Sequence, residues 1–393
     1  MTEQALGKDK RQEKQDMPLA LYIHWPFCLA KCPYCDFNSH VRPDIDAALW
    51  QDALLSDMAH EAALTQGRRL SSIFFGGGTP SLMSPETVAA LIDAATRYWQ
   101  PTSDIEITLE ANPSSVEADR FQSLALAGVN RLSLGIQALD DTSLHFLGRI
   151  HNVQEALSAL DIAQKNFSRV SFDLIYGRPN QSLKDWEEEL KQALAFGSDH
   201  LSLYQLTIEE GTRFHSLVRQ GQFTPMDGDK AADLFDLTRD MTKAAGIPAY
   251  EISNHARKNS ESRHNLTYWR YGDYIGIGAG AHGRRLNNVT IRHKKPENWL
   301  SAVQKQQQGI QEETPLSPKD QAIEAVLMGL RLTEGIHPEN IQKRTGLDIS
   351  EFLDIAAIQY YSDQGLLTFN NGLLRITEQG VLLTDALIRE ISL

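Results

Sequence analysis

The residues best suited to chemistry are three cysteines, Cys28, Cys32 and Cys35, in a chain of 393 residues that has no other cysteine. Three and two residues separate them, so their thiolates can converge on one metal centre. A structural zinc site needs four ligands and would have to recruit His24 or His40. Unmodified structural cysteines are usually buried singly. An iron–sulfur cluster held by three cysteines keeps an open coordination position on one iron, where chemistry takes place.

The CX3CX2C spacing after the first apolar run resembles the signature of radical S-adenosylmethionine (SAM) proteins, and Tyr34 before the third cysteine fits that pattern. The resemblance implies a [4Fe–4S] cluster on Cys28, Cys32 and Cys35, whose open iron binds the amino acid part of SAM. It also implies that an electron from the cluster can cleave SAM to a deoxyadenosyl radical.

Further polar and glycine residues lie at or beyond the ends of the following apolar runs. Taken singly, the glycines could form a tight turn, and each charged residue could be a cap or a surface ion pair. Taken together, they line one rim of the predicted barrel. There a carboxylate can accept hydrogen bonds from ligand hydroxyl groups, and an arginine can pair with a ligand carboxylate. They match the SAM contacts of the oxygen-independent coproporphyrinogen III oxidases and their relatives. That resemblance implies SAM contacts at Tyr22, Phe37, Gly77, Gly78, Thr79, Glu110, Gln137, Arg149 and Asp173.

The coproporphyrinogen oxidases carry a fourth cysteine two positions after the third, where this chain has Phe37. The opening YIHWPFC and the CDF ending of the cysteine loop instead resemble the HemW-type heme chaperone branch. The resemblance covers the chain from about residue 18 to about residue 390. The HNxxYW motif of that branch is present as His264, Asn265, Tyr268 and Trp269.

This motif offers two interpretations. An imidazole can ligate heme iron, and Tyr268 and Trp269 offer flat surfaces to a porphyrin. Alternatively, His264 and Asn265 satisfy buried backbone groups while the aromatic side chains pack. The family resemblance favours heme binding, with His264 and the later His282 as candidate iron ligands.

The apolar runs alternate with segments of helical periodicity, which indicates a parallel sheet covered on both faces. Functional residues after successive strands favour a barrel over a Rossmann fold. We therefore predict an α/β fold, a partial (β/α)6 TIM-like radical SAM barrel with a small C-terminal helical, winged-helix-like domain. The predicted strands are 19–24, 72–75, 105–110, 131–137, 170–176 and 201–206, and the predicted barrel helices are 47–64, 85–98, 116–127, 153–165 and 183–195.

Four segments are expected: a disordered tail at 1–17, the barrel at 18–245, an HNxxYW-containing extension at 246–310, and the C-terminal domain at 311–393. The segment QQQGIQEETPLSP is predicted to be a polar linker. Helices are predicted at 319–332, 338–345, 351–364 and 378–391, with a hairpin at an Asn-Gly turn. Residues 276–281 match GxGxxA, but no helix or acidic residue follows at the required places. We reject NAD binding and predict a tight glycine turn beside HNxxYW.

The charge balance excludes other classes of protein. With 38 Lys+Arg against 51 Asp+Glu, the net charge is −13, which argues against nucleic acid as a partner. The winged-helix-like region has six basic and eleven acidic residues, the wrong sign for DNA. No apolar run approaches about 18 residues, so no transmembrane helix is predicted. The first sixteen residues show no targeting signal, and we predict a cytoplasmic protein.

The resemblance implies a heme chaperone that binds heme, a [4Fe–4S] cluster and SAM, and delivers heme to acceptors such as respiratory hemoproteins. It also implies dimer formation and contact with a membrane surface. The alternative is a radical SAM enzyme that decarboxylates a porphyrinogen. The missing fourth cysteine and the HNxxYW motif count against that reaction.

Overall fold

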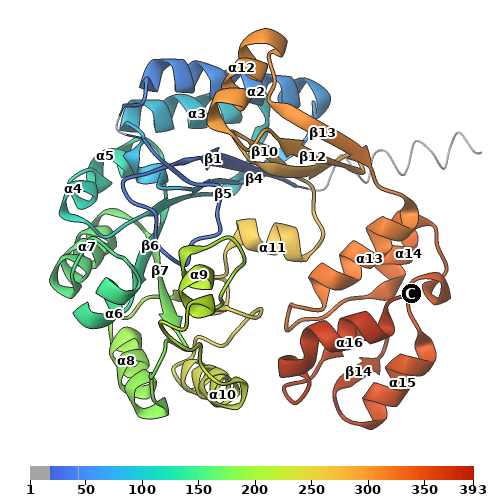
Figure 1. Ribbon diagram of the computed structural model, residues 1–393. Coiled ribbons are helices and arrows are strands. Elements are labelled where there is room, and N and C mark those ends of the chain that lie inside the picture. Colours follow the sequence, from blue (N-terminus) through green and yellow to red (C-terminus); the bar gives the residue numbers. More distant parts are fainter. Residues whose placement is uncertain (1–17, 43) are drawn as a thin grey trace, which may run out of the picture.

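The computed structural model describes residues 18–42 and 44–393 (Figure 1). The predicted disordered tail, residues 1–17, lies outside the described residues. An α/β part is built on one large sheet, and a smaller C-terminal part consists of helices and a hairpin. Among the described residues, no helix is both long and apolar enough to cross a membrane.

Six parallel strands form the centre of the sheet, and their spatial order follows the sequence. This arrangement confirms the predicted α/β barrel. Side chains alternate along each strand: Trp25 faces the outer helices and packs on Trp50, with 6.0 Å between ring centroids, whereas Tyr22 and His24 face inward. The strands are β1 (Leu19–Trp25), β4 (Arg69–Gly77), β5 (Gln100–Ala111), β6 (Arg131–Gln137), β7 (Arg169–Tyr176) and β8 (His200–Gln205).

Helices surround the outer face of these strands (Figure 1). Capping boxes at Asn152 and Ser182 start α7 and α8. The helix predicted at 116–127 is interrupted between Ala118 and Phe121, and the Glu117 carboxylate turns inward to accept from Ser81 and the backbone of Asn112. These helices are α2 (Ala47–Leu64), α3 (Pro85–Tyr98), α4 (Ser115–Ala118), α5 (Phe121–Leu126), α6 (Asp141–Phe146), α7 (Val153–Asn166), α8 (Leu183–Ala195) and α10 (Gly228–Ala244). α9 (Arg213–Arg219) does not lie on this face but beside the loop that follows β1.

The chain after residue 246 extends both edges of the sheet. At one edge β9 (Asn254–Ala256) pairs antiparallel with β8. At the other edge β10 (Tyr274–Ile277) pairs parallel with β1. Antiparallel strands β11 (His282–Arg285), β12 (Asn288–Arg292) and β13 (Ile310–Pro315) follow, with α12 (Pro296–Gln306) before the last. The predicted polar linker was therefore wrong, because its central residues form β13.

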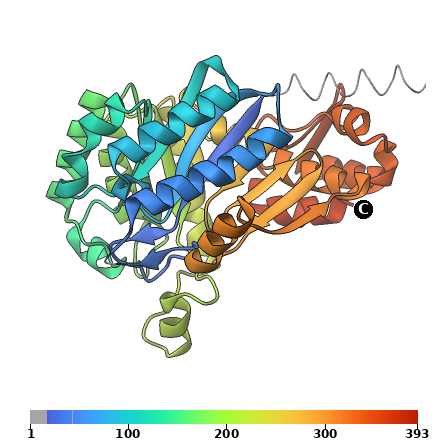
Figure 2. The ribbon, with the colours of Figure 1, turned by 90° about the horizontal axis from the view of Figure 1, so that it is seen from above.

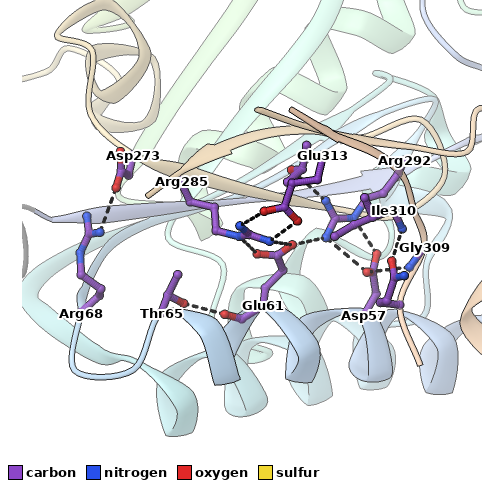
Figure 3. A network of polar contacts seen from close by, with 12 residues as sticks. Asp57, Glu61, Thr65, Arg68, Asp273, Arg285, Arg292, Gly309, Ile310 and Glu313 are labelled. Carbon is purple, nitrogen blue, oxygen red and sulfur yellow. Dashed lines mark hydrogen bonds and ion pairs between the residues drawn. The ribbon is translucent and has the colours of Figure 1, made fainter. Parts of the chain in front are cut away.

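A buried ion cluster fixes these added strands to α2 (Figure 3). Arg292 Nε lies 2.8 Å from Asp57 Oδ2, and its Nη2 lies 2.9 Å from Glu61 Oε1. Arg285 Nε lies 2.5 Å from Glu61 Oε2, and its Nη1 lies 2.7 Å from Glu313 Oε1. An unpaired interior charge costs several kcal/mol. The polar strands are therefore accommodated in the sheet only together with α2.

The C-terminal part has its own apolar core, which includes Phe352 and Leu374. Its hairpin turns at Asn371 and Gly372, both with positive φ, as the Asn-Gly pair predicted. Two predicted helices begin later than expected, the first at the Asp354 cap and the second after a 3-10 turn. The elements are α13 (Pro318–Gly329), α14 (Pro338–Thr345), α15 (Ile355–Asp363), β14 (Leu367–Asn370), β15 (Leu373–Ile376) and α16 (Thr384–Ile391).

The two sequence motifs lie at opposite ends of the barrel strands. The cysteine loop follows the carboxyl end of β1, and Figure 2 shows α9 projecting from the same side of the molecule as β2 (Phe27–Cys28) and β3 (His40–Val41). HNxxYW forms α11 (Arg263–Trp269), and the chain just before it is bound by Arg169, the first residue of β7. α11 therefore closes the amino ends of the strands.

Candidate functional site

The three cysteines lie on a loop at the mouth of the barrel. All three thiols are free and partly buried, and the backbone N–H of Cys35 donates to the carbonyl of Cys32 at 3.2 Å. Phe214 of α9 donates its backbone N–H to the Pro33 carbonyl oxygen, which connects the cysteine loop to α9. Among residues 18–42 and 44–393, no three Cys, His, Asp or Glu side chains are arranged around a single metal ion. A [4Fe–4S] cluster does not require three ligands around one ion, because each thiolate binds a different iron.

A glycine-rich strand end lies directly against this loop. Gly77 has a φ of +111°, and a Cβ added at Gly78 would lie 2.6 Å from the carbonyl oxygen of Phe27. Only glycine permits this approach of β4 to the cysteine loop. Burial raises the pKa of the Cys28 thiol, and a hydrogen bond with Thr79 opposes that rise.

Arg149 connects the thiol loop to the rim. Its Nη1 donates to Cys32 Sγ at 3.2 Å, and its Nη2 donates to Asn112 Oδ1 at 2.5 Å. The Nε of Arg149 and the Oε1 of Gln137 are buried and have no hydrogen-bond partner in the described structure. Gln137 also has a φ of +76°. Orphaned donors and acceptors beside three thiols are what a bound polar ligand would satisfy, so the residues fit a cluster with SAM.

Two partly buried carboxyl groups, Glu110 and Asp173, lie close enough to interact further inside the barrel. Burial, reinforced by the nearby Asp173, raises the pKa of Glu110 to about 8. Burial likewise raises the pKa of Asp173 to about 6, although Ser202 and Ser133 donate to it. The Tyr22 hydroxyl lies 2.9 Å from His24 Nδ1. This arrangement can accept hydrogen bonds from the hydroxyl groups of a ligand.

The raised pKa of Glu110 predicts a pH effect on stability. Between pH 5 and 8 the unfolded chain has released the Glu110 proton while the native protein keeps it, so stability falls as pH rises. We expect Glu110→Gln to remove this contribution, which has a limiting slope of about 1.4 kcal/mol per pH unit. Urea unfolding of SAM-free protein at several pH values measures it. The exposed Glu187→Gln is the control, and parallel wild-type and Glu110→Gln profiles would contradict the prediction.

Phe37 differs from the other predicted SAM contacts. Its side chain is 61% exposed. Its backbone contacts the loop, through hydrogen bonds with Cys35 and Ser39. The structure thus gathers Tyr22, Gly77, Gly78, Thr79, Glu110, Gln137, Arg149 and Asp173 in the barrel and at its mouth, and leaves the Phe37 ring outside.

Two asparagines that were not predicted from the sequence organise the barrel mouth. Asn38 donates to the carbonyls of Ala279 and Lys294 at 2.8 and 2.9 Å. Asn112 links Arg149 to Thr79. Asn38 directly follows Phe37 in CDFN, and Asn112 stands two positions after Glu110 in LEAN, so their closeness to predicted site residues was the available signal.

The glycine turn predicted beside HNxxYW lies elsewhere. β10 ends at Ile277, and the turn that follows contacts the cysteine end: a Cβ on Gly278 would lie 2.3 Å from the His24 carbonyl oxygen, and one on Gly280 would lie 2.2 Å from Asn38 Nδ2. The prediction of its position was wrong, because β10 carries the chain from one end of the barrel to the other.

His264 of the HNxxYW motif is a buried packing residue. It is 1% exposed, its Nδ1 lies 2.9 Å from Ser72 Oγ, and its Nε2 lies 2.5 Å from the Tyr268 hydroxyl. Its ring stacks on Phe74 at 4.8 Å between centroids. Both ring nitrogens of His264 therefore have hydrogen-bond partners within the protein. Burial also lowers the pKa of His264 to about 3.

The other motif residues have different surroundings. The Asn265 backbone N–H is capped by Ser262, and Trp269 packs against the cluster of Tyr250 and Leu332. His282 is exposed and its Nδ1 lies 2.6 Å from the hydroxyl of Tyr274, a residue stacked edge-on against Tyr268.

Comparison with known proteins agrees with this geometry. The radical SAM superfamily model matches residues 22–193, and the HemN C-terminal domain model matches residues 316–383. The solved structure of coproporphyrinogen III oxidase (HemN) from Escherichia coli, described as a radical SAM enzyme, has a TM-score of 0.82 at 22% identity. The match covers 99% of this chain and 93% of that one. Fold and thiol loop together define a radical SAM protein, a class that implies a [4Fe–4S] cluster and SAM.

Relatives define the family within that class. Heme chaperone HemW from Escherichia coli (strain K12) is 39% identical over 94% of this chain and 97% of its own. Radical S-adenosyl methionine domain-containing protein 1, mitochondrial, from Bos taurus is 38% identical over 94% of this chain and 86% of its own. The chain belongs to the HemW family, as the cysteine loop and HNxxYW predicted.

Proposed function

We propose that this protein is a heme chaperone, which binds heme, holds a [4Fe–4S] cluster with SAM, and transfers heme to acceptor hemoproteins. The observation that carries the proposal is the 39% identity to heme chaperone HemW over nearly the full length of both chains. The cysteine content supports it, because Phe37 stands where the coproporphyrinogen oxidases have a fourth cysteine.

In this proposal Cys28, Cys32 and Cys35 ligate three irons of the cluster, and the fourth iron binds SAM. A reduced cluster can supply an electron to SAM. Arg149 holds the Cys32 thiolate and offers its unpaired Nε to the SAM carboxylate. The remaining SAM contacts are Tyr22, Phe37, Gly77, Gly78, Thr79, Glu110, Gln137 and Asp173, with Phe37 acting through its backbone.

The proposal also divides the chain by role. Residues 18–245 form the SAM-binding barrel, residues 246–310 carry HNxxYW, and residues 311–393 form the C-terminal domain. The acceptors are respiratory hemoproteins reached at a membrane surface, and the chaperone works as a homodimer. We propose a cytoplasmic location, although relatives such as the one from Bos taurus are named mitochondrial.

Porphyrinogen decarboxylation is the competing activity. Coproporphyrinogen III oxidase is 22% identical to this chain, so the structural match supports the fold alone. No specific contact in the described residues favours that reaction over heme binding.

An anaerobic heme titration of the reconstituted protein tests the proposal. The same sample is then assayed with coproporphyrinogen III, SAM and a reductant. We expect one heme per chain and no protoporphyrinogen. Turnover without heme binding would replace the chaperone by an oxidase with a three-cysteine site.

A further inference from the structure

A large cleft lies between the end of α11, the chain that follows it and the C-terminal domain, at the amino end of the barrel strands. Its volume is about 770 Å³, within the range of pockets that hold small organic ligands. Figure 1 shows α11 lying between the sheet and the C-terminal helices. The lining includes Trp269, Tyr271, Leu332, Ile336, His337 and Arg344.

The HNxxYW motif contributes to the lining of this cleft. Trp269 is the motif residue that lines it, and Tyr271 follows two positions later. Leu332, which packs with Trp269, and Ile336 and Ile341 supply aliphatic surface to the same cleft. Flat aromatic and aliphatic walls suit a planar macrocycle.

His337, at the rim, is oriented as a metal-ligating histidine. Its Nδ1 lies 3.0 Å from the backbone carbonyl oxygen of Gly372. A carbonyl only accepts, so Nδ1 carries the proton and the Nε2 lone pair faces outward. Among the described residues, no protein group bonds to that Nε2. A backbone carbonyl on the second nitrogen is the usual way in which proteins fix the tautomer of a metal ligand.

A cation lies on α14, the helix that His337 caps. Lys343 lines the cleft and has no ion-pair partner in the described part of the chain. The other two cations of the lining are already held: Arg344 donates to the Tyr271 carbonyl oxygen at 2.6 Å and lies 3.5 Å from Asp273 Oδ1, and Arg270 pairs with both carboxylate oxygens of Glu334. Lys343 can therefore receive a propionate of a heme.

The histidines of the motif region are worse placed to ligate iron. His264 is 1% exposed and both its nitrogens are bonded inside the barrel. His282 is exposed, but it does not line the cleft. An iron ligand at the rim of the cleft, such as His337, would also allow heme to leave again for an acceptor.

We propose that this cleft is the heme site, that Nε2 of His337 ligates the heme iron, and that Lys343 binds a heme propionate. The proposal rests on the proposed chaperone function and adds the ligand and the location. Binding forms one Fe–N bond and displaces solvent from the iron, with no change in oxidation state.

Spectrophotometric titration of ferric heme into full-length protein tests this site. His337→Ala is expected to weaken heme binding about tenfold or more and to shift the Soret band, because the axial nitrogen is lost. Asn340→Trp is expected to weaken binding similarly by filling the cleft from an exposed position of α14. His60→Ala, on α2 away from the cleft, and His264→Ala are expected to keep the wild-type Soret position.

Three outcomes are informative. Loss of affinity in both cleft variants, with iron and SAM content unchanged, supports the site. Wild-type affinity and spectrum in both variants would overturn it and leave the chaperone function intact, with His264 or His282 as ligand. Absence of heme binding by the wild-type protein would overturn the proposed function itself.

Discussion

Replacing Cys28, Cys32 or Cys35 singly with alanine is expected to abolish the brown cluster absorbance and to leave the barrel folded. In the proposed ligand set each thiolate holds a different iron, so two thiolates would leave the cluster without a full set of protein ligands. The loop lies at the barrel mouth, outside the main apolar core. Iron and sulfide analysis after reconstitution should fall from about four irons per chain to nearly none, while the far-ultraviolet circular dichroism stays constant.

Ser39→Ala provides the matched control for the cysteine variants. Ser39 Oγ lies 3.8 Å from Cys35 Sγ, so its removal disturbs the same loop without removing a thiol. This variant should keep its cluster. One cluster per chain in any of the three alanine variants would refute the ligand assignment.

Arg292→Met is expected to destabilise the protein by about 3–5 kcal/mol. Arg292 and Asp57 are both completely buried, and the substitution would leave the Asp57 carboxylate facing only neutral donors, among them Trp299 and Gly309. Asp57 also accepts from the backbone N–H of Gly278, next to the cysteine end. The damage should therefore extend to cluster loading.

Urea unfolding measures the destabilisation caused by Arg292→Met. Lys165→Met is the control, because Lys165 pairs with Asp161 on the surface, where such pairs contribute about 0–1 kcal/mol. Equal midpoints for the two variants would show that the buried ion cluster contributes no more than a surface pair.

The barrel could be predicted because its strands are buried on both faces and appear as apolar runs. The strands β11–β13 could not, since HGRR, NVTIR and IQEETP are polar in sequence. They are part of the sheet because Glu61 lies beside Arg285, 224 residues away along the chain. Local sequence patterns carry no sign of such a pairing.

The candidate site divides in the same way. The thiol loop could be predicted because three ligands lie within eight residues. The cleft could not, because its walls come from α11 and from C-terminal elements more than 50 residues later. Likewise, the sequence of HNxxYW could not reveal that Ser72 and Tyr268 occupy both nitrogens of His264.

A column of side chains joins the two ends of the barrel. His24 Nε2 lies 2.9 Å from the Asn38 carbonyl oxygen, the Tyr22 hydroxyl contacts His24, and the rings of Tyr22 and His264 lie 6.3 Å apart. His264 continues to Tyr268, the neighbour of the cleft residue Trp269 in α11. Two ligands linked through one column obey thermodynamic reciprocity: the factor by which SAM changes heme affinity equals the factor by which heme changes SAM affinity. If heme binds in the cleft as proposed and SAM changes its affinity, emptying the cleft would change SAM affinity by the same factor.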